Sequence, residues 1–186
     1  MFPHTSISGF FDWSHPGVYQ YSGAPRSGYL RLVKPFVLQF LPKGVIWIDF
    51  PRRYESYAIG PDSTSESLSQ LVVYTPTSLE EAVLITDDLE MRWLAGLTEK
   101  RPHLIVADLP LWYAIEKRLG EKITKGMVLI LHLLSFYASA YGIKVLMINE
   151  LRQTPENGEI RPVLESLVLR FVTQSFQLER STKERI

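Results

Sequence analysis

The chain has 186 residues, of which 46% are hydrophobic and 22% are charged, so it is long enough for one folded domain with a sizeable core. Lys and Arg together number 20, as do Asp and Glu, and this zero net charge provides no general attraction to nucleic acid or membranes. The absence of cysteine excludes disulfide bonds, thiol catalysis and cysteine-ligated zinc.

The N-terminal residues show no basic start followed by an apolar core, so we expect no signal peptide and a cytoplasmic location. The most apolar stretch, 127–141, is shorter than the roughly 20 residues that cross a membrane, and it contains His132. We interpret it as a buried helix in which His132 is a core histidine.

The first half of the chain predicts a strand, a helix and a second strand. A short apolar run at 18–21 is followed by apolar residues at helical spacing between 30 and 41. Pro35 lies inside this pattern and has no N–H to donate, so the helix is expected to be bent or to start late. The continuous apolar run at 45–50 is typical of a buried parallel strand.

The second half continues this alternation. Further buried strands are predicted at 71–76, 103–110 and 143–150. Ser78 and Glu81 form a capping box that starts a helix running to about residue 100, with a break near Asp87-Asp88. Helical sequence fills 111–141, and Gly142 is suited to cap it.

The last segments, 167–172 and 175–180, are predicted to form a C-terminal antiparallel hairpin. Strands that alternate with helices predict an α/β fold, with a mostly parallel sheet covered by helices on both faces. We expect a single domain, 1–186, that consists of an N-terminal segment, 1–17, and a core, 18–186.

A possible nucleotide-binding loop follows the first strand. Gly23 and Gly28 are five residues apart, with Arg26 and Ser27 between them, which matches the phosphate-loop pattern G-x-x-x-x-G-K-[ST] except at its last two positions. Tyr29 stands where the lysine belongs and Leu30 where the magnesium-binding hydroxyl belongs. The loop therefore has the glycine frame of a phosphate loop without its charged and hydroxyl groups.

Polar residues end three of the predicted strands, in the stretches VIWIDFP, HLIVADLP and VLMINEL. Together with GAPRSGYL, and in this order, these stretches resemble the core ATPase domain of the RecA/RadA recombinase family, most strongly its short archaeal RadA paralogues. The resemblance runs from about Val18 to Arg180. It implies a three-layer RecA-like core.

The departures from the family pattern imply a loss of catalysis. The family's catalytic glutamate, two residues after the position of Asp49, is Pro51, and the family's Asn-Gln pair is Asn149-Glu150. A carboxylate at the second position repels phosphate. Only Asp108 keeps the residue expected at the magnesium-linked position. The resemblance therefore implies a protein that does not hydrolyse ATP and binds neither ATP nor Mg²⁺ tightly, while weak residual nucleotide binding at the loop stays open.

The resemblance also implies partners. It suggests an accessory paralogue in homologous recombination and DNA repair, which acts through the recombinase or another paralogue in a homo- or hetero-oligomer. Two loops that face single-stranded DNA in the family are basic here, and the candidate DNA-binding residues are Lys117, Arg118, Lys122, Lys125, Arg152 and Arg161. Interspersed glutamates and the lack of interleaved aromatic residues weigh against a strong site.

Two questions remain open from the residues alone. Asp49 and Asp108 should end neighbouring strands, so the alternative function is a metal-dependent phosphohydrolase or nuclease that uses both carboxylates. No third acidic ligand and no paired histidines are placed with them, so no metal site is predicted. The second question concerns aromatic residues before the first strand, which either join protomers, as this region does in recombinases, or pack on the chain's own core; they are Phe2, Phe10, Phe11 and Trp13.

Overall fold

The computed structural model describes residues 9–24, 28–50, 69–95, 101–108, 121–153, 159–162 and 164–178. The strands are β1 (Gly17–Gly23), β2 (Val45–Asp49), β3 (Leu71–Tyr74), β4 (Leu104–Asp108), β5 (Lys144–Gln153), β6 (Ile160–Pro162) and β7 (Gln174–Leu178). The α-helices are α1 (Val33–Phe40), α4 (Leu79–Leu94), α6 (Glu121–Tyr141) and α7 (Glu165–Val168), and the 3-10 helices η2 (Tyr29–Leu32) and η3 (Leu41–Lys43) flank α1.

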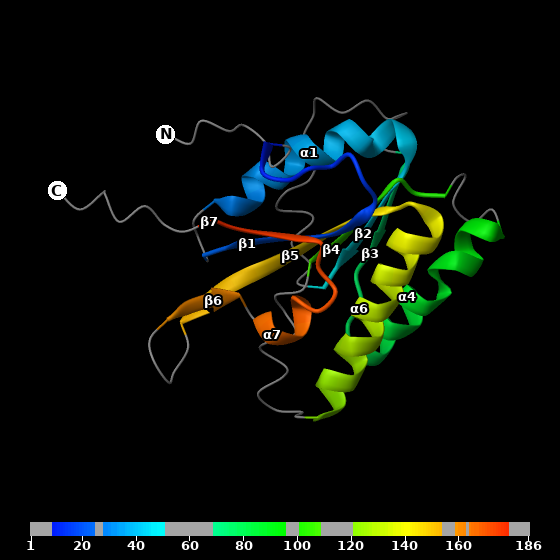
Figure 1. Ribbon diagram of the computed structural model, residues 1–186. Coiled ribbons are helices and arrows are strands. Elements are labelled where there is room, and N and C mark those ends of the chain that lie inside the picture. Colours follow the sequence, from blue (N-terminus) through cyan, green and yellow to red (C-terminus); the bar gives the residue numbers. More distant parts are fainter. Residues whose placement is uncertain are drawn as a thin grey trace.

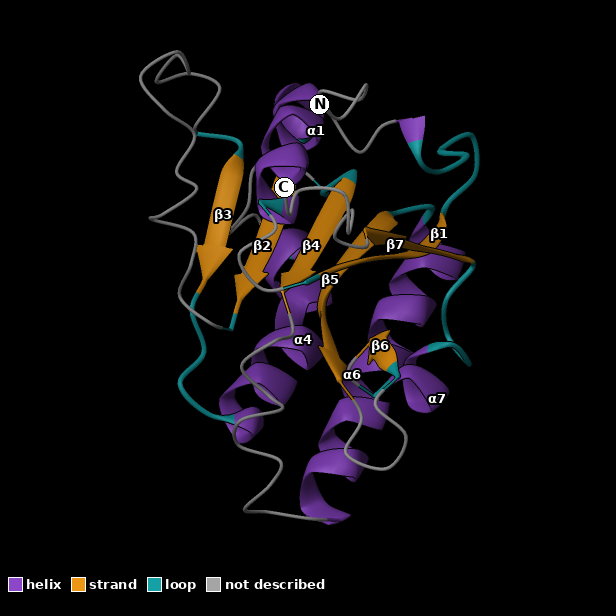
Figure 2. Cartoon of the chain, turned by 90° about the vertical axis from the view of Figure 1, so that its left-hand side faces the viewer, coloured by secondary structure: helices purple, strands orange, loops and turns teal. Residues whose placement is uncertain are grey.

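The strands form one seven-stranded sheet in the order β3-β2-β4-β5-β1-β7, and β6 pairs with β5 outside this path. All pairings along the path are parallel, and only β5 and β6 pair in the antiparallel sense. α1 covers one face of the sheet, while α4, α6 and α7 lie on the other face (Figures 1 and 2). The predicted mostly parallel sheet between two helical layers is confirmed.

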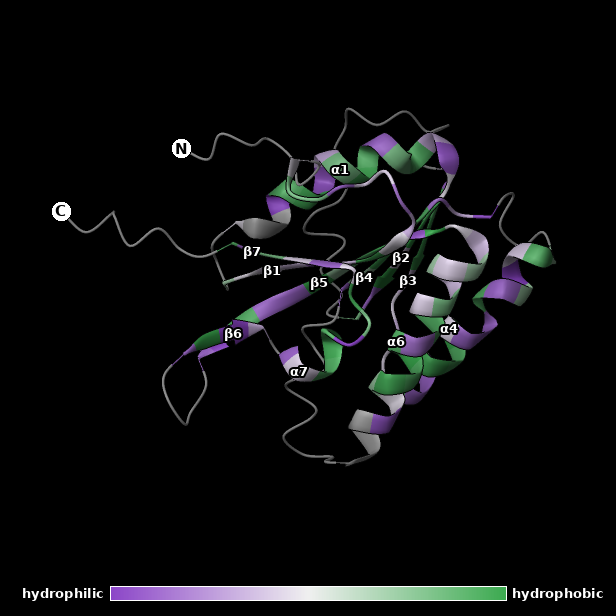
Figure 3. Ribbon diagram, in the orientation of Figure 1, coloured by the Kyte–Doolittle hydropathy of each residue, from purple (hydrophilic) through white to green (hydrophobic). Residues whose placement is uncertain are grey.

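The core has two parts, one on each face of the sheet. β2 and β4 are buried along their whole length, and their side chains alternate between the two parts, so these strands are apolar at almost every position (Figure 3). Trp47 and Val106 pack on the α1 face, whereas Ile46 and Ile105 pack on the face that α4 and α6 cover.

Local signals explain where the helices begin and end. The α-helical part of the first helix starts only at Val33, which places Pro35 in the first turn, where its missing N–H removes no helical hydrogen bond. The predicted late start is therefore confirmed. Ser78 Oγ accepts a hydrogen bond from the Glu81 N–H at 3.1 Å and caps α4. Gly142, with φ +68°, follows the last residue of α6.

Two predictions about the helices are wrong. α4 is continuous from Leu79 to Leu94, so the expected break near Asp87-Asp88 does not occur; both aspartates are exposed on the outer side of the helix. His132 is exposed on α6 and is not a core residue. Its neighbours Leu131 and Leu134 are fully buried, so the helix turns His132 away from the sheet.

The C-terminal hairpin exists in a different form from the one predicted. Residues 165–168 form α7, and β7 pairs in parallel with β1. The Thr173 N–H donates to the Val18 carbonyl at 2.7 Å where β7 joins the sheet. The antiparallel hairpin in this part of the chain is made by the end of β5 and by β6. The apolar run at 167–172 packs against the helical face of the core instead, where Val168 is buried.

The N-terminal aromatic residues pack on the chain's own core. The Phe10 ring stacks on Phe176 of β7 at 4.1 Å between centroids, and Trp13 contacts both Tyr19 and Phe36 at 4.2 and 4.3 Å. The Asp12 N–H donates to Gln174 Oε1 at 3.0 Å. This segment therefore belongs to the domain on the α1 face. Phe2 lies outside the described residues.

Candidate functional site at the carboxyl edge of the sheet

The strand-end residues singled out by sequence come together at one edge of the sheet. Asp49 of β2 lies directly opposite Asp108 of β4, as predicted for neighbouring strands. Two strands away, Gly23 at the end of β1 lies opposite Glu150 of β5. Pro51 lies outside the described residues. The predicted carboxyl-edge site is therefore assembled from β1, β2, β4 and β5.

These side chains are buried. Asp49 is 1%, Asp108 0%, Asn149 2% and Glu150 8% exposed. Glu150 has a close cationic partner, since the Arg152 guanidinium donates to Glu150 Oε2 at 2.6 Å. Asn149 Oδ1 accepts the Glu150 backbone N–H at 2.8 Å. Both members of the Asn149-Glu150 pair are thus bound within the chain.

The polar side chains lie on opposite faces of the sheet. Along a strand, alternate residues share a face. Asp49 and Asp108 share the α1 face with Trp47 and Val106, whereas Asn149 shares the α6 face with Met147. No group of three or more metal-ligating side chains occurs within the described ranges. Among the described residues, the two aspartates are therefore a pair without a third metal-ligating side chain.

The loop after β1 differs from a phosphate loop in its backbone. In a phosphate loop, the glycine-rich turn leads directly into the N-terminus of a helix, whose N–H groups bind the anion. Here Gly28 has φ +76°, its carbonyl accepts the Arg31 N–H at 2.9 Å, and η2 follows. α1 begins only at Val33, and its N-cap residue Leu32 provides no side-chain hydrogen bond. Arg26 and Ser27 lie outside the described residues, as do the side chains of Tyr29 and Leu30.

The candidate DNA-binding residues are only partly brought together. Arg152 and Arg161 are direct cross-strand neighbours in the β5–β6 hairpin. Arg161 is ion-paired with Glu159 and, at 3.8 Å, with Glu165. Lys125 is exposed on α6, and Lys122 belongs to the same helix. Lys117 and Arg118 lie outside the described residues. Two arginines of the hairpin thus lie beside three carboxylates, from β5, from the residue before β6 and from α7, in line with the interspersed glutamates noted in the sequence.

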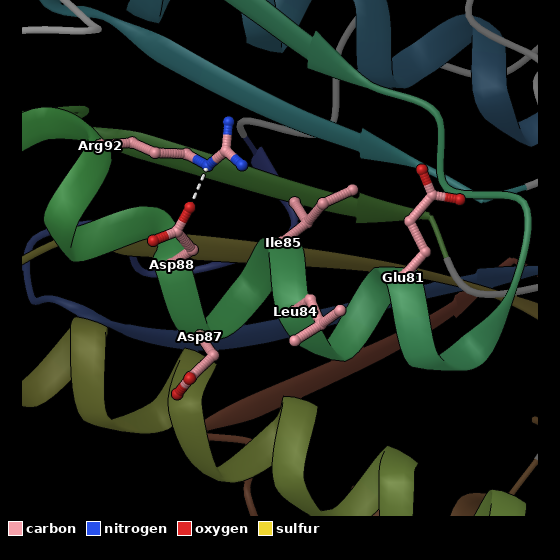
Figure 4. Close-up of a pocket in the computed structure, with 6 residues that line it drawn as sticks. All are labelled: Glu81, Leu84, Ile85, Asp87, Asp88 and Arg92. Atoms are coloured by element: carbon pink, nitrogen blue, oxygen red, sulfur yellow. Dashed lines mark ion pairs between the residues drawn. The ribbon is translucent and has the colours of Figure 1, made fainter.

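Sequence reasoning missed a second surface, on the outer side of α4. Leu84, Met91 and Leu94 are 67%, 63% and 69% exposed, the highest values among the large hydrophobic side chains of the described residues. A shallow pocket beside them is lined by Glu81, Leu84, Ile85, Asp87, Asp88 and Arg92 (Figure 4). Within the pocket, Arg92 Nε pairs with Asp88 at 2.9 Å. The available signal in the sequence was that Leu84 and Leu94 fall on the polar side of a helix that is otherwise amphipathic.

A mostly parallel sheet between two helical layers, with polar residues ending its central strands, defines a RecA-like α/β fold. The chain is similar to a solved structure described as "Crystal structure of the RadB recombinase", with a TM-score of 0.63 and 20% sequence identity over 91% of this chain and 77% of that chain. At this identity the similarity establishes the fold. No protein-family model and no curated protein matches the sequence. Across the described ranges, no helix is long and apolar enough to span a membrane.

Proposed function

We propose that the protein is a non-catalytic RecA-like paralogue that assists homologous recombination and DNA repair by binding a recombinase or another RecA-like paralogue. The RecA-like fold and the similarity to a RadB recombinase support this class of function. The main support for the absence of catalysis is the backbone after Gly28, where a 3-10 helix separates the glycine from the start of α1.

Catalysis of phosphoryl transfer in this fold depends on positioning and on neutralisation of charge. Tyr29 and Leu30 supply neither the cation nor the metal-binding hydroxyl, and each lost contact costs roughly 2–4 kcal/mol of transition-state stabilisation. The displaced helix start removes α-helical N–H groups from the end of the loop. Glu150, opposite Gly23, adds a carboxylate to the edge where a triphosphate would lie.

An ATPase assay tests the non-catalytic assignment. We expect no ATP turnover above background and no tight binding of a fluorescent ATP analogue with Mg²⁺, beside an active recombinase as the positive control. Turnover at a recombinase-like rate that is abolished by Asp108→Asn would contradict the assignment. Asp108→Asn is suited to this test because it removes the charge while keeping the size of a fully buried side chain.

The outer surface of α4 is the partner-binding surface in this proposal. Exposed large hydrophobic side chains gathered on one helix are unusual in a monomer and mark interaction sites. α4 also carries five acidic residues and one arginine, so its surface is acidic as well as apolar. A partner segment with apolar and basic side chains fits this combination.

Binding to the purified recombinase of the same cells tests the surface. Leu84→Glu and Met91→Glu should each weaken binding by about tenfold or more, because central apolar contacts carry most of the energy of an interface. Ile160→Glu is the matched control, since Ile160 is also a largely exposed hydrophobic residue but lies on β6. Equal binding by all three variants would exclude this surface.

A metal-dependent phosphohydrolase or nuclease is the second candidate, favoured only by the direct pairing of Asp49 and Asp108. If it were correct, Mg²⁺ or Mn²⁺ would let the protein cleave labelled DNA or a phosphomonoester, and Asp49→Asn would stop the reaction. We expect intact substrate after prolonged incubation, because the described residues offer these two carboxylates no third ligand, and two carboxylates alone hold such ions poorly.

A further inference from the structure

Four basic residues gather at the amino edge of the sheet, opposite the edge where the strand-end residues lie. Three chain segments are hydrogen-bonded side by side there: the His103 N–H donates to the Gly44 carbonyl at 3.0 Å, and the Lys144 N–H donates to the His103 carbonyl at 3.1 Å. Lys43 precedes Gly44, and Arg101 lies two residues before His103. Lys43, Arg101, His103 and Lys144 therefore come together from the starts of β2, β4 and β5; we call them the amino-edge cluster.

The amino-edge cluster is a local excess of positive charge in a neutral chain. No described carboxylate forms an ion pair with any of its members, in contrast to the arginines of the β5–β6 hairpin. The pKa of His103 is lowered, first by burial and then by the charges of Lys43, Arg101 and Lys144. The three cations are thus close enough to act on one imidazole. Lys43 and Arg101 are exposed and Lys144 is half-buried, so solvent reaches the cluster.

We propose that the amino-edge cluster binds the phosphate backbone of nucleic acid. Neighbouring strands lie about 4.8 Å apart, so the segments that start β2, β4 and β5 span about 10 Å. A nucleic-acid strand presents a phosphate about every 3.4 Å along a duplex axis, and so places two to three phosphates within this span. Long Lys and Arg side chains from three parallel strand starts match such a row of charges.

The contact is to phosphates, and base sequence does not affect it. Lysine and arginine side chains neutralise phosphates with release of counterions, which makes the affinity strongly salt-dependent and insensitive to sequence. An acidic surface of another protein is the competing ligand for such a cluster. Its three cations favour nucleic acid, because the phosphates of a nucleic-acid strand offer regularly spaced charges without requiring a complementary folded surface.

The amino-edge cluster shares no residue with the α4 surface or with the β5–β6 hairpin. The inference goes beyond the proposed function, which requires only a protein partner. It predicts that binding depends on residues that play no part in the proposed partner contact or in the carboxyl-edge site. This separation allows the two proposals to fail independently.

Fluorescence anisotropy with labelled single-stranded and duplex DNA tests the proposal. Lys43→Gln, Arg101→Gln and Lys144→Gln should each weaken binding and lower the salt dependence, by about one in the slope of log affinity against log salt for each lost phosphate contact. The triple variant should lose binding by about a hundredfold or more at low salt. Arg170→Gln, an exposed arginine after α7, is the matched control and should bind like the parent.

Four outcomes overturn the proposal, and the first three concern DNA binding. The triple variant, shown to be folded by circular dichroism, binds DNA like the parent; the parent shows no salt-dependent binding; or Arg152→Gln and Arg161→Gln abolish binding while the triple variant retains it. The third outcome would place the DNA on the hairpin and leave the proposed function intact. Binding of an acidic protein but not of DNA, lost in the triple variant, would also reject it.

A pH titration of His103 provides an independent test. Phosphates that occupy the cluster offset the three cations around His103, so its pKa, followed by NMR of the imidazole protons, should rise when DNA is added. An unchanged titration of His103 at saturating DNA would count against the site even if DNA binds elsewhere.

Discussion

Arg152 and Arg161 lie directly opposite each other in the antiparallel pairing of β5 with β6. Like charges at such positions repel and destabilise the pair of strands. Both guanidinium groups are balanced by carboxylates, Arg152 by Glu150 at 2.6 Å and Arg161 by Glu159 and Glu165. The hairpin is therefore held by a small network of charges, and its arginines are less available to DNA than their number indicates.

Removing one carboxylate should expose this repulsion. Glu150→Gln is expected to lower the free energy of unfolding by on the order of 1 kcal/mol, a modest value because the guanidinium of Arg152 is half exposed and screened by solvent. Urea unfolding in low and high salt measures the effect, which should shrink in high salt. A loss of stability that does not depend on salt would show that packing, not charge, explains the variant.

His103 should make stability depend on pH. Its pKa in the folded protein lies below the ordinary value of 6.5, so the unfolded chain takes up the proton more readily. The contribution of His103 to the free energy of unfolding is therefore complete above the ordinary histidine range. It is lost as the pH falls through that range towards the lower pKa of the folded protein. Thermal unfolding from neutral to mildly acidic pH should show this loss, and His103→Gln should reduce it. His132→Gln, at an exposed site on α6, is the comparison variant.

Tyr137 of α6 is hydrogen-bonded to α4, its neighbour on the same face of the sheet. Its hydroxyl donates to the Thr86 carbonyl at 2.7 Å and approaches the Asp87 carbonyl at 3.3 Å. Tyr137→Phe should cost about 1 kcal/mol of unfolding free energy, because it removes a buried hydrogen bond between α6 and α4. Urea unfolding measures this cost, and equal stability of Tyr137→Phe and the parent would contradict it.

The same tyrosine predicts an effect at alkaline pH. Burial raises the pKa of Tyr137 to about 12, above its ordinary value of 10.0. Ionisation therefore favours the unfolded chain, and stability should begin to fall as the pH rises through the ordinary tyrosine range. Ultraviolet absorbance at alkaline pH should show a tyrosine that titrates late in the parent and is missing in Tyr137→Phe.

The N-terminal segment should contribute to stability. Phe11 is buried and contacts the rings of Trp13 and Tyr19. Phe11→Ala should lower the free energy of unfolding by about 3 kcal/mol, the cost typical of a buried phenylalanine. Leu84→Ala, at an exposed site on α4, should change it by less than about 0.5 kcal/mol. Similar stability of both variants would contradict this prediction and favour the alternative, in which the N-terminal aromatic residues join protomers.

Local sequence signals determined much of this fold. The apolar runs that became β2 and β4 are long, uninterrupted and bounded by turn residues, because strands buried on both faces need apolar side chains at every position. The capping box at Ser78 and the glycine at 142 mark helix ends through hydrogen bonds and backbone angles within a few residues. The pairing of Asp49 with Asp108 followed from the order of parallel strands.

Only the tertiary structure decided what depends on distant contacts. β7 joins β1 although about 155 residues separate the Val18 and Thr173 that are hydrogen-bonded there, and the apolar run before it suits a hairpin strand as well as α7. Hydrophobic periodicity does not decide which strand a segment pairs with, because it shows which side of the segment is buried and not which element lies beside it. Strand register and order, which the whole sheet sets at once, decide the face on which Asn149 lies and place Lys43 and Lys144 at the same edge of the sheet.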